Sequence, residues 1–311
     1  MSDIRIGLIG GSGLASAIAG QTHGVIHVID TPFGAPSAPI IETEWNGLPV
    51  YFLSRHGAGH TRNPSQVPYR ANIFAMKKLG VTHILASGAV GSLREEYKPR
   101  DLVIPDQIID KTRRQSTFFE AAAVHVEFAE PFCPVLRQIL LEAGNGMTVP
   151  DGAHRAVHDG GCYVAMEGPA FSTRAESLMH RVWGGDLIGM TAMPEAKLAR
   201  EAEISYALVA LVTDYDCWKH TPATEGSAKP DPQQLLREII GNLSIASENA
   251  VNLLKRAVEL IAANPGVADC PAASALKLAI WSDKRQIPQD EVDRLAVLWI
   301  QYFRTTEPLP G

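Results

Sequence analysis

The sequence lacks the features that tie a protein to a membrane or to nucleic acid. None of its 311 residues belongs to a run that approaches the roughly 20 consecutive apolar residues needed to cross a bilayer. The first residues lead directly into a strand pattern and not into a signal peptide. With 28 Lys and Arg against 34 Asp and Glu, the chain has a formal charge of −6 and no basic block. We therefore expect neither a membrane nor a nucleic acid among its partners.

Cysteine is scarce and widely spaced. The four cysteines are Cys133, Cys162, Cys217 and Cys270, and no two of them form a C-x-x-C pair. Zinc sites and disulfide frameworks usually show closer or more regular spacings. We therefore expect no metal site and no disulfide framework, and a cytoplasmic location in which thiols stay reduced.

Apolar runs of strand length alternate with helical patterns along most of the chain. Several of these runs are continuous, as in strands that are buried on both faces. The expected strands cover residues 4–9, 25–29, 50–53, 83–86, 102–104, 163–165, 187–190 and 206–212, and the expected helices cover residues 69–79, 134–143, 174–183, 194–202 and 232–263. This alternation predicts an α/β fold with a central mixed, largely parallel sheet flanked by helices.

The chain changes character after residue 263. Residues 262–270 contain Asn264-Pro265-Gly266 and are typical of a linker. Beyond them, residues 272–281 and 288–303 have the pattern of two helices, and the second has an apolar face. We predict a single domain over residues 1–263 and a C-terminal helical extension over residues 264–311, which packs on the same domain or forms an oligomer contact.

A glycine-rich loop, Gly10-Gly11-Ser12-Gly13, follows the first expected strand. Such a loop can be a plain turn, or it can present backbone N–H groups to a phosphate while Ser12 adds a hydroxyl. Gly11-x-Gly13 together with Asp30 also imitates a dinucleotide-binding unit, although the third glycine is missing. From this motif alone a turn, a phosphate site and an NAD site all stay open.

Groups suited to an anion follow three other expected strands. Arg55 offers a guanidinium fork suited to phosphate, and His56 can donate to another oxygen. The small residues Ser87-Gly88-Ala89 would let the backbone approach a ligand closely, and Thr191 adds a hydroxyl beside Met190. Because ligands of α/β sheets bind at the carboxyl ends of strands, we expect these groups to converge on one site.

Two aspartates, Asp214 and Asp216, follow the apolar run over residues 206–212. In an extended chain they lie on one face, where each carboxylate raises the proton affinity of the other. Taken alone, the pair could form salt bridges, bind a metal or belong to a turn. With anion donors at other strand ends, it becomes a candidate for acid chemistry at the far end of the same site.

Eight ordered blocks of the sequence match a family of enzymes. They are GGSGL (10–14), DTPFGAPS (30–37), RHGAGHTRNPSQVPYRANIFAMKKLG (55–80), GSLREE (91–96), AEPFCP (129–134), EGPAFSTRAES (167–177), MTAMPEAKLARE (190–201) and TDYDCWK (213–219). Over about residues 4–260 the chain closely resembles the 5′-methylthioadenosine phosphorylases, which form a branch of the trimeric purine nucleoside phosphorylase family. The resemblance implies phosphorolysis of methylthioadenosine to adenine and 5-methylthioribose 1-phosphate. It implies inorganic phosphate as co-substrate, no organic cofactor and no metal, and a homotrimer or a dimer of trimers.

The resemblance also implies roles for individual residues. The phosphate site falls on Ser12, Arg55, His56 and Thr191 with a backbone contact at Ala89, the sugar contact on Met190, the base stack on Phe171 with Ser172 nearby, and the purine-reading acids on Asp214 and Asp216. His125 matches a residue that reaches the 5′ end of the substrate in a neighbouring subunit. Glu167, ahead of the same helix as Phe171, could hold sugar hydroxyls.

Three features depart from the family pattern. Gly88 occupies a position where the family often has a hydroxyl, and Ser87 or backbone donors could replace it. Residues 221–232, which should cover the alkylthio pocket, do not align clearly. The C-terminal extension reaches beyond the usual end of the family.

The expected mechanism uses the two acids in different ways. A protonated Asp214 would donate to N7 of the departing purine, while Asp216 supports this geometry and selects adenine. Alternatives are a purine nucleoside phosphorylase acting on other adenine or 6-oxopurine nucleosides, an NAD-dependent oxidoreductase, and a nucleoside-binding protein without turnover. The acid pair argues against 6-oxopurines, and an oxidoreductase would leave Arg55, His56 and Thr191 without a common purpose.

Overall fold

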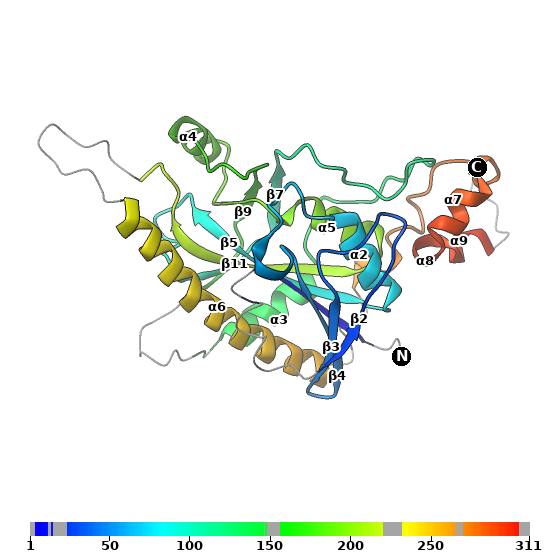
Figure 1. Cartoon of the computed structure of the whole chain (residues 1–311), viewed down its shortest axis with the longest axis horizontal. Helices are drawn as coiled ribbons and strands as arrows, with labels where there is room; N and C mark the ends of the chain where they lie inside the picture. Colours follow the sequence, from blue (N-terminus) through cyan, green and yellow to red (C-terminus); the bar gives the residue numbers. More distant parts are fainter. Residues whose placement is uncertain are drawn as a thin grey trace, which may run out of the picture.

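The structure is a computed structural model that describes residues 4–11, 14, 24–145, 147, 156–219, 232–264, 266 and 270–304. Within these residues eleven strands form one sheet, with the path β2-β3-β4-β1-β5-β10-β9-β7; β11 joins β5 to β6, and β6 also pairs with β8 (Figure 1). The strands are β1 (Ile6–Gly10), β2 (Val25–His27), β3 (Ile40–Trp45), β4 (Leu48–Ser54), β5 (His83–Ser92), β6 (Leu102–Ile104), β7 (Gln107–Asp110), β8 (Val157–Asp159), β9 (Cys162–Ala165), β10 (Leu187–Gly189) and β11 (Ser205–Tyr215).

The helices lie close to their predicted positions up to residue 263. They are α2 (Tyr69–Lys78), α3 (Pro134–Gly144), α4 (Arg174–Val182), α5 (Ala192–Glu201), α6 (Pro232–Ala263), α7 (Gln289–Arg294), α8 (Ala296–Trp299) and α9 (Gln301–Arg304), with 3-10 turns η1 (Ala58–His60), η3 (Pro271–Ser274) and η4 (Lys284–Gln286). No helix of the described ranges is both long and apolar enough to cross a membrane.

Parallel pairing in the centre of the sheet brings several strand ends to one edge. β1 is parallel to β4 and to β5, and β5 is parallel to β11. β10 runs antiparallel to β5, and β3 runs antiparallel to β2 and β4. The sheet is therefore mixed, as predicted, and the carboxyl ends of β1, β4, β5 and β11 lie at a common edge. The short strands β3, β7 and β8 had no clear signal in the sequence.

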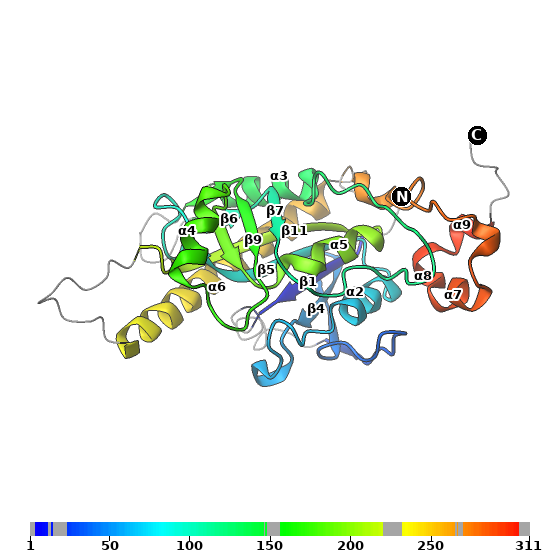
Figure 2. The same cartoon turned by 90° about the horizontal axis from the view of Figure 1, so that it is seen from above.

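Apolar side chains cover both faces of the sheet. On one face α2 and α5 contribute residues such as Phe74 and Leu198 to a buried cluster. On the other face α3 and α6 contribute Leu140 and Leu254 to a second cluster. Two views show α6 running along the molecule, with α7–α9 at the end opposite the first turns of α6 (Figures 1 and 2).

The C-terminal extension differs from its predicted form. The helix expected over residues 272–281 is wrong, because only η3 forms there and Ile280 then pairs with Val124 in an isolated bridge. The helix expected over residues 288–303 is broken into α7, α8 and α9. The breaks leave Trp299 fully buried, with its ring 4.7 Å from that of Phe119. The extension therefore packs on the core of the same chain, while the domain boundary at residue 263 stays a prediction.

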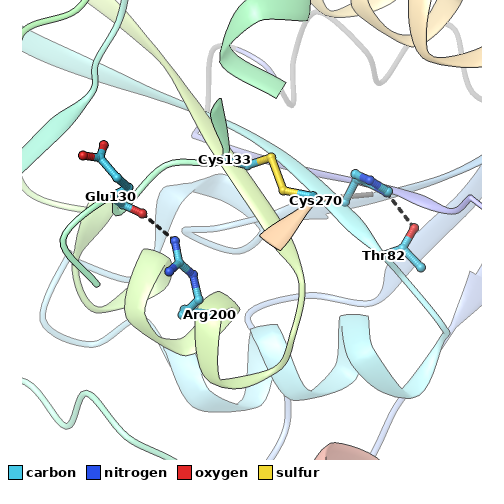
Figure 3. The surroundings of a disulfide bond; sticks show 6 residues. Thr82, Glu130, Cys133, Arg200 and Cys270 are labelled. Atoms are coloured by element: carbon cyan, nitrogen blue, oxygen red, sulfur yellow. Dashed lines mark hydrogen bonds between the residues drawn. A yellow bond between two sulfur atoms is a disulfide. The ribbon is translucent and has the colours of Figure 1, made fainter. Parts of the chain in front are cut away.

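Cys133 and Cys270 form a disulfide, so the expectation that the cysteines stay reduced is wrong for this pair (Figure 3). The two cysteines are 137 positions apart in the sequence, and their Cα atoms lie 6.8 Å apart. Cys133 precedes α3 and Cys270 precedes η3. Cysteine spacing could not reveal this pair, because the fold alone brings the two positions together. Of the four cysteines, Cys162 and Cys217 are unpaired.

Candidate active site

A cavity of about 570 Å³ lies at the edge where the strand ends meet. This volume is in the range of cavities that bind small organic ligands. The sequence-predicted residues that line it are Arg55, His56, Ser87, Gly88, Ala89, Phe171, Ser172, Met190, Thr191, Asp214 and Asp216. Ser12 lies outside the described residues, although its neighbour Gly11 lines the cavity. Groups predicted from separate stretches of sequence thus share one cavity.

Arg55 is buried and paired with an acid that the sequence did not point to. Its Nε and Nη2 atoms each lie 2.8 Å from an oxygen of Glu195 on α5, and both side chains are almost completely inaccessible. Its Nη1 donates to the Ser87 carbonyl at 2.8 Å. Burial would lower the pKa of Arg55, but the Glu195 carboxylate raises it above the usual range. Arg55 is therefore a fixed cation with its counter-ion already in place.

His56 is held in a defined orientation next to Arg55. Its Nδ1 lies 2.8 Å from the Arg62 carbonyl oxygen, which can only accept, so Nδ1 carries a proton. Burial and the charge of Arg55 lower the pKa of His56 to about 4. At neutral pH the imidazole is therefore uncharged and Nε2 is an acceptor. This differs from the donor role that the sequence suggested, and it suits a ligand oxygen that bears a hydrogen.

Gly88 and Thr191 approach each other across the cavity wall. A Cβ atom added at Gly88 would lie 3.3 Å from the Thr191 hydroxyl oxygen. β10 is antiparallel to β5, and this pairing returns the chain from Leu187, opposite Ser92, toward the position of Gly88. The absence of a side chain at residue 88 therefore leaves room for the Thr191 hydroxyl, which is a physical reason for glycine at this position.

The two aspartates follow an irregularity in β11. Along the pairing with β5, Val212 faces Val90 but Asp214 faces Gly91, so Thr213 is an extra residue in the ladder. The Thr213 hydroxyl oxygen lies 2.6 Å from Asp214 Oδ1. Asp216 is buried, and its Oδ2 atom has no hydrogen-bond partner among the described residues. A buried oxygen without a partner at a cavity wall is suited to a ligand donor.

Two predicted residues do not line the cavity. The Glu167 carboxylate accepts from the Ser65 hydroxyl and from the backbone N–H of Arg113, and it pairs with the Arg114 guanidinium. His125 is exposed, its backbone N–H donates to the Ala279 carbonyl, and its ring packs against Trp281. The sugar contact of Glu167 and the contact of His125 with a neighbouring subunit stay predictions.

Arg114 is a residue that sequence reasoning missed, and its side chain is only 7% exposed. Its Nη1 atom donates to the carbonyl oxygens of Met190 at 2.6 Å and Met193 at 2.9 Å, and its Nη2 atom donates to the Glu167 carbonyl at 2.6 Å. Arg114 therefore fixes the segment that carries Met190 and Thr191. No local pattern marks it, because its partners come from distant parts of the chain.

The first half of α6 supplies a wall that the sequence analysis did not assign. Leu236, Ile239, Leu243 and Ser247 line the cavity from this helix. Their spacing of three to four residues places them on one face of a helix. This periodicity was visible in the sequence, but a helix face of this kind is more often part of a core. Residues 220–231, which precede α6, lie outside the described residues.

The structure gives no support to a dinucleotide site or a metal site. Asp30, which would bind a ribose in the NAD alternative, does not line the cavity. Its carbonyl instead accepts from Lys78 at 3.3 Å. Within the part of the chain that the structure describes, no group of three or more His, Cys, Asp and Glu side chains could hold a metal ion.

Comparisons with known proteins find relatives that match nearly the whole chain. The model of the phosphorylase superfamily matches residues 5–259. An S-methyl-5′-thioadenosine phosphorylase from Synechocystis is 46% identical over 306 residues, which cover 97% of this chain and 89% of that protein. An S-methyl-5′-thioadenosine phosphorylase from Gloeobacter violaceus is 47% identical over 302 residues, which cover 96% of each chain. Because these matches cover almost the whole chain, the expectation that the C-terminal extension reaches beyond the usual end of the family is wrong for these relatives.

Solved structures show the same relationship. The methylthioadenosine phosphorylase from an antarctic soil metagenomic library superposes on this chain with a TM-score of 0.84 and is 46% identical to it. The match covers 96% of this chain and 99% of the metagenomic chain. The methylthioadenosine phosphorylase from Schistosoma mansoni, solved in complex with adenine, has a TM-score of 0.77 and 35% identity, and it covers 89% of this chain and 99% of that one. Since relatives this similar extend along nearly the full length, the chain belongs to the S-methyl-5′-thioadenosine phosphorylases of the phosphorylase superfamily.

Proposed function

We propose that this protein catalyses the phosphorolysis of 5′-methylthioadenosine, which yields adenine and 5-methylthioribose 1-phosphate. The observation that carries the proposal is the joint occurrence, in one cavity, of an acid pair at Asp214 and Asp216 and of anion-binding groups around His56 and Thr191. A phosphorylase needs both ends, because the reaction leaves negative charge on the purine and joins phosphate to the sugar. The named relatives and the adenine complex of the Schistosoma protein support the same substrate.

At the phosphate end, neutral groups outnumber charged ones. We assign phosphate contacts to the Thr191 hydroxyl, the backbone along Ser87, Gly88 and Ala89, His56, Arg55 and the Ser12 hydroxyl. Because the neutral His56 presents Nε2 as an acceptor, a hydroxyl of hydrogen phosphate would donate to it. The remaining phosphate oxygens would accept from the other groups and leave one oxygen to attack C1′ of the sugar.

At the purine end, we assign proton donation to Asp214 and support to Asp216. Both residues line the cavity, where a protonated Asp214 would donate to N7 of the departing purine. Phe171, a cavity-lining residue that is 82% exposed, would stack on the purine ring, with Ser172 beside it. Met190 would lie against the sugar.

The α6 wall fits the 5′ end of the proposed substrate. Leu236, Ile239 and Leu243 present apolar side chains to the cavity. A methylthio group is apolar and has no hydroxyl to satisfy, so burial against such a wall is favourable. A 5′-hydroxyl in the same place would lose its hydrogen bonds to water, which favours the thioether over an ordinary nucleoside.

Release of adenine should depend on phosphate. We expect purified protein incubated with 5′-methylthioadenosine at neutral pH to form adenine only when inorganic phosphate is present, because no other nucleophile is held against C1′. Chromatography of the products, with and without phosphate, measures this directly. Adenine release at the same rate in phosphate-free buffer would instead indicate a hydrolase, and no release in either buffer would reject the proposed reaction.

We further infer a homotrimer, or a dimer of trimers, located in the cytoplasm. His125 and the C-terminal extension contact each other, and α7–α9 lie at the end of the molecule opposite the first turns of α6 (Figures 1 and 2). His125 would therefore reach the 5′ end of a substrate only in another copy of the chain. Sedimentation equilibrium should give a mass of three or six chains, and a monomer would reject this assembly.

A further inference from the structure

Almost every hydrogen-bond donor of Arg55 is already used within the protein. A guanidinium has five N–H groups. Two of them meet Glu195 at 2.8 Å, one meets the Ser87 carbonyl at 2.8 Å and one points to the Ile9 carbonyl at 3.4 Å. A single N–H on Nη1 remains for a ligand. Arg55 therefore cannot bind an anion through the pair of N–H groups on Nε and Nη2, because Glu195 already accepts from both.

The pair is also electrically balanced. Glu195 is completely buried, and its Oε1 accepts a further hydrogen bond from the Tyr206 hydroxyl at 2.9 Å, which fixes the carboxylate. Among the described residues that line the cavity, Arg55 is the only lysine or arginine. An incoming phosphate therefore meets a cation whose charge is cancelled by a carboxylate at hydrogen-bond distance.

This balance bears on how phosphate can react. A phosphate that is strongly paired with a cation is bound tightly, but its oxygens are weaker nucleophiles. Binding energy that is spent on the ground state lowers KM without raising kcat. Phosphate must be bound in this site and must then attack C1′. Hydrogen-bond donors without net charge bind it while leaving its oxygens more nucleophilic.

We propose that Glu195 is a positioning residue that acts through Arg55: by neutralising its charge and occupying its fork, Glu195 keeps phosphate loosely bound and reactive. The inference rests on the proposed function, since it assigns a role within the same phosphate site. A purely structural role for Glu195 predicts the opposite sign, because a misplaced Arg55 would weaken phosphate binding.

Two substitutions of Glu195 separate charge from geometry. Glu195→Gln keeps the shape of the side chain and removes the charge, so that Arg55 is left without a counter-ion and phosphate can take that place. Glu195→Asp keeps the charge and shortens the side chain. Tyr206→Phe is the matched control, because it removes only the hydrogen bond to Oε1 of Glu195. Circular dichroism and thermal unfolding establish that each variant is folded.

The measurement is the Kd of inorganic phosphate by titration calorimetry, together with kcat at saturating phosphate and methylthioadenosine. We expect Glu195→Gln to bind phosphate at least fivefold more tightly than the wild type and to lose at least fivefold in kcat. Glu195→Asp and Tyr206→Phe should keep the wild-type Kd within about threefold.

Each other outcome rejects the inference. Unchanged or weaker phosphate binding by Glu195→Gln overturns it, as does a parallel loss in affinity and kcat. If Glu195→Gln does not fold, Glu195→Asp decides alone: a Kd raised more than tenfold shows that geometry and not charge is the role of Glu195. A wild-type protein that binds no phosphate would overturn the proposed function itself, and the inference with it.

Discussion

Replacing Asp214 by Asn should lower kcat for methylthioadenosine by about 10³-fold, within the range of 10² to 10⁴ that general acid catalysis contributes. The purine leaves as an anion unless a proton reaches N7, and an amide cannot supply that proton at a useful rate. The Thr213 hydroxyl, 2.6 Å from Asp214 Oδ1, would still orient the amide, so binding should change far less than turnover. Steady-state kinetics with saturating phosphate measures both quantities.

Two controls keep this result interpretable. Asp159→Asn makes the same chemical change in an exposed side chain that pairs with Arg137 outside the cavity, and it should leave kcat within about twofold. A 7-deaza analogue of the substrate has no N7 to protonate, so the wild type should bind it without cleaving it. Near-normal kcat for Asp214→Asn, or rapid cleavage of the 7-deaza analogue, would reject Asp214 as the acid.

Local sequence signals were sufficient for the polar residues that follow the apolar runs. The apolar runs over residues 83–86 and 206–212 predicted β5 and β11, and the polar groups just beyond them line the cavity. The strands extend further than these runs, since β5 ends at Ser92 and β11 at Tyr215, but the end of each apolar run is encoded within a few positions. Because β1, β4, β5 and β11 pair in parallel, the residues that follow their apolar runs lie close together in space.

Long-range partners were not predictable in the same way. Glu195 is 140 positions from Arg55, and as part of the segment Ala192–Glu201 it has the pattern of an ordinary helical acid. Its burial decides its role, and burial depends on the packing of α5 against the sheet. The pairing of Cys133 with Cys270 and the contacts of Arg114 were hidden for the same reason.

In the C-terminal extension, local helix preference competes with packing against the core, and composition alone does not show which of the two prevails. Residues 275–281 contain good helix formers, yet the backbone of Ala279 and Trp281 bonds to His125 and Ala123 instead of continuing a helix. The gain is the burial of Leu276 and Ile280 in the main core. Tertiary packing thus outweighs the local helical preference, which is a weak term.

The acid pair should also make the site select adenine over 6-oxopurines by about 10⁴-fold in kcat/KM. Adenine presents a donor at position 6, whereas hypoxanthine presents an acceptor. Asp216 Oδ2 is buried without a partner among the described residues, so it can accept from an amino group, and a carbonyl oxygen near it would meet only repulsion. Methylthioadenosine and methylthioinosine differ only in the group at position 6 and in the hydrogen that hypoxanthine carries at N1, which makes them the matched substrates for the measurement.

Asp216→Asn tests the source of this preference. An amide can donate to a 6-carbonyl, so we expect the variant to reduce the ratio of kcat/KM for the two substrates by at least tenfold, through both a loss on methylthioadenosine and a gain on methylthioinosine. A ratio that stays unchanged would place the discrimination elsewhere in the cavity. Equal kcat/KM for the two substrates in the wild type would show that the carboxylates of Asp214 and Asp216 do not select the base. Asp214 would then keep its role as proton donor, and Asp216 would have no role in selecting adenine.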